Sequence, residues 1–279
     1  MAAERYQHSG RFTPQAFLFM PFLAVAMLAP ALLYGVATIY SPCIGITTVL
    51  AVVGYAFAAG MMGGHALRYA HTRNRLVAMV LSAFIGLAAL WAAWVAFLGV
   101  MVAKAGADVP LWAVFLPSVD AAMIGSLDDH GWFTLKGMTP DGGILALIWL
   151  VEAVGIVGFS AYTAFNLVDS PYCESCQKWT TRRALPGAIA SGAGMVNAVD
   201  LANAEAIGRV PAAPAGATIF ERLSVQTCPT CTRMRTLSLS TVRQSTDSKG
   251  RTSESITVLV PHVLVDEAFV ERVCTARST

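Results

Sequence analysis

Charged side chains are scarce in this chain of 279 residues. They make up 13% of the residues, whereas hydrophobic residues make up 56%, and an average soluble domain has about 25% charged residues. The formal net charge of +2 is too small for the basic surface that a nucleic-acid partner requires. The deficit is uneven, because twelve of the nineteen lysines and arginines follow Asp169. The composition therefore predicts a membrane-embedded first part and a soluble last part.

Motifs of common catalytic sites are also missing. The sequence contains no Walker-type phosphate loop, no G-x-S-x-G, no H-E-x-x-H and no Gly-rich dinucleotide-binding turn. The apolar segments also lack the sets of His and Asp that membrane proteases and oxidases need. These absences favour a protein that is not an enzyme.

Four apolar segments are each near or above the ~20 residues that a bilayer crossing requires. They cover residues 16–40, 43–67, 76–103 and 143–168. A cleaved signal peptide is the competing interpretation of the first segment, but its apolar run is longer than a signal core. We expect a short N-terminal segment (1–15), a bundle of four transmembrane helices (16–168) with an outer loop (104–142), and a C-terminal domain (169–279).

The distribution of lysine and arginine predicts the orientation of these helices. The loop 68–75 carries three arginines and no acidic residue, whereas the loop 104–142 carries two lysines and five aspartates. The first loop is therefore expected in the cytoplasm and the second outside. With four crossings, both termini are then cytoplasmic, in the inner (plasma) membrane of a bacterial cell.

Three residues inside the apolar segments stand out. Glu152 is the one acidic residue well inside a segment, so it is a candidate for a proton or ion relay. A structural hydrogen bond to a neighbouring helix is an equally good interpretation. Gly60 and Gly64 form a small-xxx-small pair that lets helix backbones approach closely, here most simply within the bundle itself.

The outer loop carries a helical pattern of apolar residues between Trp112 and Leu127, which predicts a short amphipathic helix on the membrane surface. Asp128, Asp129 and His130 follow it. Two carboxylates and one imidazole are an incomplete ligand set, so a solvated helix end is favoured over a metal site.

Two C-x-x-C pairs are the strongest signal in the sequence. Cys173 and Cys176 follow the last apolar segment directly, and Cys228 and Cys231 come 51 residues later. Four thiolates from two such pairs match one tetrahedral metal ion, for which zinc is the usual occupant. Iron in the same geometry, a redox-active dithiol and cysteines without metal are the alternatives.

The residues around the second pair predict a small α+β domain. A helix is expected at 197–209, strands at 219–226, 234–244 and 255–265, and a closing helix at 266–273 that Asp266 caps. Together with the two cysteine pairs, this pattern resembles a zinc ribbon from Cys173 to about Val265. The resemblance implies that Cys173, Cys176, Cys228 and Cys231 are the metal ligands. The long interval between the pairs departs from the family's usual spacing and predicts a helical insertion.

These features favour a non-catalytic membrane scaffold whose zinc-stapled cytoplasmic domain docks a protein partner or complex. The lipid bilayer and that protein are the expected partners. One alternative is a transporter or channel component that uses Glu152. Another is a membrane-bound electron carrier with iron at the four cysteines.

Overall fold

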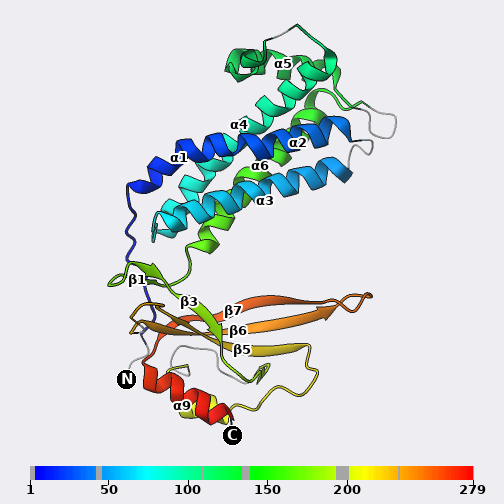
Figure 1. Ribbon diagram of the computed structural model, residues 1–279. Helices are drawn as coiled ribbons and strands as arrows, with labels where there is room; N and C mark the ends of the chain where they lie inside the picture. Colours follow the sequence, from blue (N-terminus) through cyan, green and yellow to red (C-terminus); the bar gives the residue numbers. More distant parts are fainter. Residues whose placement is uncertain are drawn as a thin grey trace. The chain divides into compact units, whose positions relative to one another are not determined.

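The chain folds into two compact units (Figure 1). The computed structural model describes residues 4–41, 46–108, 110–133, 139–192, 201–231 and 233–278. One unit is Ser9–Asp169, and the other combines Met1–His8 with Ser170–Thr279. The expected start of the second span at residue 43 and the first residues of the helix expected at 197 lie outside the described residues.

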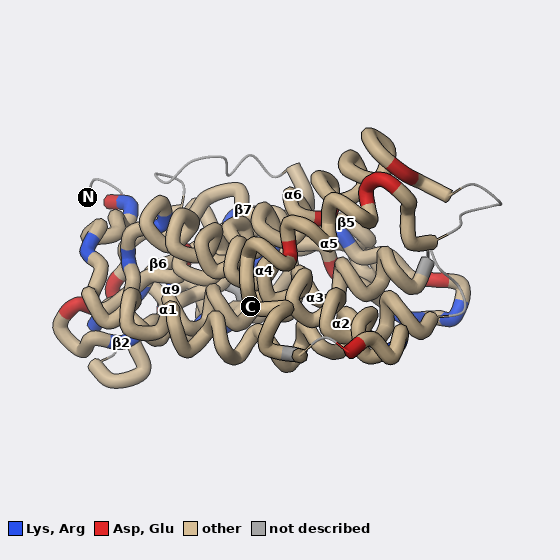
Figure 2. The backbone as a smooth tube through the Cα atoms, turned by 90° about the horizontal axis from the view of Figure 1, so that it is seen from above, with Lys and Arg blue, Asp and Glu red and all other residues tan. Residues whose placement is uncertain are grey.

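The unit Ser9–Asp169 contains four helices that are long and apolar enough to cross a membrane: Gln15–Tyr40, Thr47–Tyr69, Arg75–Ala105 and Gly142–Leu167. The four spans predicted from hydropathy are thus confirmed as helices of sufficient length. The backbone of α1–α4 is almost wholly tan in Figure 2, because charged residues are rare between the helix ends. The individual helices are α1 (Gln15–Ala26), α2 (Leu28–Tyr40), α3 (Ile46–Tyr69), α4 (Arg75–Ala105) and α6 (Gly142–Leu167).

The first span is divided at Met27, where α1 ends and α2 begins. Pro30 follows three residues later and has no backbone N–H for the carbonyl of Ala26, which is four residues before it. Pro21 lies inside α1 without ending it. The break between α1 and α2 therefore lies near Pro30, where a helix hydrogen bond is missing.

Small residues allow α6 to lie close against its neighbours. A Cβ atom added to Gly60 would lie 2.8 Å from Thr163 Oγ1, and one added to Gly64 would lie 2.5 Å from Leu167 Cδ1. These contacts join α3 to α6. On α4, a Cβ atom at Gly86 would lie 2.9 Å from a backbone atom of α6. Side chains at these positions would force the helices apart.

Two arginines hold the C-terminal end of α6. Arg68 Nη1 donates a hydrogen bond to the carbonyl oxygen of Leu167 at 3.0 Å. Arg75 forms an ion pair with Asp169 at 2.9 Å. The last carbonyls of a helix carry partial negative charge, so a cation such as Arg68 is stabilising there.

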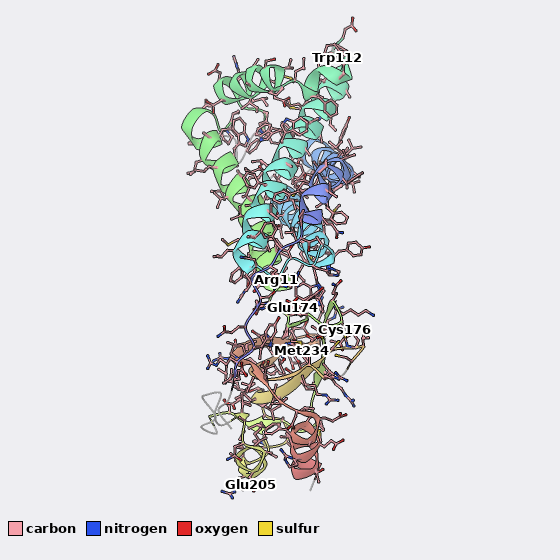
Figure 3. The ribbon with its side chains drawn as sticks, turned by 90° about the vertical axis from the view of Figure 1, so that its left-hand side faces the viewer. Arg11, Trp112, Glu174, Cys176, Glu205 and Met234 are labelled. Carbon is pink, nitrogen blue, oxygen red and sulfur yellow. The ribbon has the colours of Figure 1, made fainter. Side chains whose placement is uncertain are left out.

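The outer loop forms the opposite end of this unit. It contains a 3₁₀ helix, η1 (Leu111–Phe115), and α5 (Pro117–His130). Figure 3 shows Trp112 at this end and Arg11 at the other. The single helix predicted between Trp112 and Leu127 is thus divided into η1 and α5, and α5 continues through Asp128, Asp129 and His130 to end at Gly131, whose φ of 66° favours glycine.

The second unit is built on an antiparallel sheet in the order β3-β5-β6-β7, with β4 paired to β5 (Figure 1). The three strands predicted from alternating residues are present as long strands, and β7 begins three residues earlier than expected. A separate two-stranded hairpin precedes the sheet. The strands are β1 (Tyr172–Cys173), β2 (Lys178–Trp179), β3 (Thr181–Ala184), β4 (Ile189–Ala190), β5 (Ile219–Thr227), β6 (Arg235–Thr246) and β7 (Thr252–Leu264).

Two helices complete the core of this unit, α8 (Ala204–Arg209) and α9 (Glu267–Ser278). The predicted cap of the closing helix is confirmed, because Asp266 Oδ1 accepts a hydrogen bond from the backbone N–H of Phe269 at 2.6 Å. The buried apolar cluster joins the sheet to both helices and consists of Leu185, Ile189, Leu201, Ile207, Leu223, Val225, Leu237, Leu239, Val260, Val263, Phe269 and Val273.

The N-terminal segment adds to this sheet, which the sequence analysis did not anticipate. Arg5 bridges Val263 of β7 in antiparallel fashion. The backbone N–H of Tyr6 donates to the carbonyl of His262 at 2.8 Å, and that of Leu264 donates to the carbonyl of Glu4 at 2.9 Å. The chain therefore leaves this unit before α1 and returns to it after α6.

Candidate metal centre

The first cysteine pair lies in the β1–β2 hairpin. Tyr172 pairs with Trp179 across it, their rings 5.0 Å apart, and Cys173 pairs with Lys178. Cys173 is buried and Cys176 lies in the turn. A positive φ of 51° at Gln177 tightens the turn, so that both thiols of the pair face the same point.

The second pair lies in the connection between β5 and β6. The pairing of these strands ends at Thr227 with Arg235, and the backbone N–H of Cys228 donates to the carbonyl of Met234 at 3.0 Å. The connection is thereby closed into a compact turn. Cys228 is fully buried, whereas Cys231 is partly exposed.

The four sulfur atoms come together at one place. All four Sγ atoms lie within 4.8 Å of one another, and Cys173 Sγ lies 3.7 Å from Cys231 Sγ. Four thiolates at about 2.3 Å from a tetrahedral ion would have sulfurs about 3.8 Å apart. A disulfide requires about 2.05 Å, and all four cysteines are free. The described residues therefore form a group that could hold one metal ion.

Hydrogen bonds differ among the sulfurs and separate their pKa values. The N–H of Arg233, followed by a bond from Cys176 and the N–H of Met234, lowers the pKa of Cys231 to about 6. Hydrogen bonding with Cys231 raises the pKa of Cys176 to about 12, and burial raises that of Cys173. Without metal, Cys173 and Cys176 therefore keep their protons at neutral pH. A divalent cation would displace them.

Strand pairing explains how two cysteine pairs separated by 51 residues meet. β3 follows the first pair and aligns with β5, with Thr181 opposite Thr227, so the second pair lies beside the first. The interval was expected to contain a helical insertion. Its described residues (177–192 and 201–227) contain α8, which is part of the helix predicted at 197–209, together with β2, β3, β4 and β5.

Figure 3 shows where this interval lies relative to the metal centre. Cys176, Glu174 and Met234 are at one end of the unit, and Glu205 of α8 is at the other. The α8 part of the interval therefore lies away from the cysteines.

The other residues singled out by the sequence lie elsewhere. Asp128, Asp129 and His130 end α5, where His130 Nδ1 lies 3.0 Å from the carbonyl oxygen of Ser126. Within the described ranges, they are not among the groups of three or more ligands close enough for a metal. Glu152 lies on α6 and accepts a hydrogen bond from the Tyr34 hydroxyl. Hydropathy alone gave no sign that Tyr34 faces it.

Comparison with known proteins gives no further guide. No protein-family model, no curated protein sequence and no solved structure matches the chain. The function must therefore be argued from the two units themselves.

Proposed function

We propose that the chain is a non-catalytic membrane scaffold: a four-helix anchor whose cytoplasmic, zinc-stapled domain docks a protein partner. The anchor would lie in an inner (plasma) membrane with both chain ends in the cytoplasm. Arg68, Arg73 and Arg75 near the ends of α3 and α4 support this orientation through the positive-inside rule.

The four-thiolate site supports a structural role for the metal. Four cysteine ligands complete a tetrahedral shell and leave no position for water or substrate. The site would tie the β1–β2 hairpin to the β5–β6 turn, which meet at the same end of the β3–β5 pairing. Cytoplasmic thiols stay reduced, which favours a metal over disulfides as the staple.

The outer edge of β7 is the observation that carries the docking role. β7 is the last strand of the sheet, and Thr252–Leu259 are all exposed. Ile256, Val258 and Leu259 are each more than 40% exposed. An exposed sheet edge with apolar side chains can pair with a strand from another protein. The same edge already accepts the N-terminal segment at Val263, so its backbone groups are available for antiparallel pairing.

Affinity purification of the full chain in mild detergent tests this proposal. We expect a co-purifying protein that is lost when charge is placed on the edge by Ile256→Lys and Val258→Lys, because lysine opposes strand addition. Ile219→Lys is the matched control, since Ile219 is 42% exposed at the start of β5. Recovery of the wild-type chain alone, without partner or self-association, would overturn the docking role.

A visible absorption spectrum of the purified protein distinguishes the zinc-stapled scaffold from the iron-based electron carrier. A zinc tetrathiolate site is colourless, whereas ferric iron bound by four thiolates is coloured. We expect one metal ion per chain by elemental analysis and no visible band.

A further inference from the structure

The helical unit contains a cavity of about 160 Å³ that the docking role does not use. Its wall comes from α2, α3, α4, α6 and the segment after α5. Glu152 contributes a carboxylate, and most of the other lining residues are aromatic or aliphatic. An apolar cavity of about 150 Å³ accommodates benzene, so this cavity has room for one small organic group.

The Glu152 carboxylate is held in place by a neutral partner. The Tyr34 hydroxyl donates to it. The Tyr34 ring is 8% exposed and stacks on the Tyr55 ring at 5.4 Å, and the Tyr55 hydroxyl donates to the carbonyl of Ala89 at 2.6 Å. In the described part of the chain, no lysine, arginine or histidine forms an ion pair with Glu152. An ionised Glu152 would therefore have no cationic partner among these residues, which is unfavourable in a membrane.

Aromatic rings from several elements line the same cavity as Glu152. The rings of Trp94 and Trp149 lie 5.0 Å apart, and those of Phe97 and Trp132 lie 4.9 Å apart. Trp94 also contacts Phe97 at 5.9 Å. Contacting tryptophan and phenylalanine rings around a space of this size form the kind of cage that binds ammonium groups through cation–π attraction.

Two further polar atoms are buried at the cavity wall. Thr48 Oγ1 and Trp132 Nε1 are inaccessible to solvent and have no hydrogen-bond partner among the described residues. The indole N–H can only donate, so a ligand with a hydroxyl or other acceptor would satisfy it. A ligand that suits this cavity would therefore carry a positive charge for Glu152 and a polar group for these two atoms.

We propose that this cavity binds a small organic cation of the quaternary ammonium class, with Glu152 as its counter-charge and the aromatic rings as its cage. Tyr34 acts as a positioning residue that orients the carboxylate. The cation is either a free solute or the headgroup of a choline lipid, since both present the same group.

The test uses the full chain in phosphatidylglycerol nanodiscs and two probes of equal size. Choline carries the positive charge, and 3,3-dimethyl-1-butanol replaces its nitrogen with carbon. By calorimetric titration, we expect choline to bind at least about tenfold more tightly than the alcohol, the effect of one desolvated cation–π contact. Equal binding of the two probes, or no binding of choline, would overturn the proposal.

Two variants test whether the preference for choline depends on Glu152, and thermal melting checks that each variant is folded. Glu152→Gln keeps the volume and the acceptor for Tyr34 but removes the charge, so the preference for choline should fall at least tenfold. Glu205→Gln, at an exposed position on α8, is the matched control and should bind as wild type. An unchanged preference in Glu152→Gln would refute the assignment.

Trp149→Leu serves as a second variant if Glu152→Gln does not fold. It removes the ring but keeps an apolar side chain, so choline binding should weaken while binding of the alcohol changes little. A loss of both probes to the same extent would contradict the cage. Repeating the titration in phosphatidylcholine nanodiscs identifies the source of the cation: weaker apparent choline binding there indicates a lipid headgroup, and unchanged binding indicates a free solute.

Discussion

Replacing Cys228 with serine is the most direct test of the metal staple. Cys228 is fully buried, and its sulfur is one of the four that lie within 4.8 Å of one another. Serine is a shorter and harder ligand, so the tetrahedral shell would be left with three thiolates. We expect the variant to lose its metal.

The magnitude follows from what the metal holds together. Binding of a structural zinc ion contributes about 10–16 kcal/mol in small zinc modules, whereas a whole domain is stable by about 5–15 kcal/mol. The sheet cluster from Leu185 to Val273 does not include the cysteines. Loss of the metal should therefore open the β1–β2 hairpin first and weaken the rest of this unit.

Limited trypsin digestion and elemental analysis measure these effects together. Cys228→Ser should contain no metal and be cut after Lys178, Arg182 or Arg183, while the helical unit remains in the membrane fraction. Cys274→Ser is the matched control, because Cys274 lies in α9 away from the cluster. A variant that has lost its metal and still resists trypsin would refute the staple.

Two other predictions concern thiol ionisation and helix packing. In metal-free protein, iodoacetamide should modify Cys231 before Cys176 at neutral pH, because pKa values of about 6 and about 12 make Cys231 the thiolate. The rate of Cys231 modification should fall as the pH drops through about 6. Equal modification rates of the two cysteines, measured by peptide mass spectrometry, would contradict this prediction. Gly86→Ala should destabilise the α4–α6 contact by roughly 1–3 kcal/mol, since its Cβ would lie 2.9 Å from the backbone Cα atom of Val157. Gly54→Ala, with open space around it, should leave the melting temperature unchanged; similar melting of the two variants would contradict the packing.

The four apolar helices could be predicted from the sequence because hydropathy is a local property. A run of about 20 apolar residues is long enough to cross a bilayer whatever its neighbours are. The strands of the second unit were similarly visible, because alternating apolar residues follow the pleat of a half-buried strand. The same applies to the cap at Asp266, whose oxygen bonds a residue three positions away.

The metal ligands were also predictable, since two C-x-x-C pairs carry the chemistry of the site in their spacing. What lies between them was predictable only in part. The helix predicted at 197–209 appears among the described residues as α8, but β3 was not predicted, because its pairing with β5 depends on partners 40 to 46 residues away, as in Arg182 with Gln226 and Thr181 with Thr227. Periodicity within β3 and β4 is too short to reveal such pairing.

The positions of the apolar helices, the long strands and the four thiols along the chain follow from local patterns, because each depends on residues near one another. Which distant residues meet depends on how the chain packs in three dimensions. This packing places Tyr34 beside Glu152, 118 positions apart, and Arg5 beside Val263. Such contacts arise from helix packing and sheet edges, where an interaction is chosen by geometry in three dimensions and leaves no periodic trace along the chain.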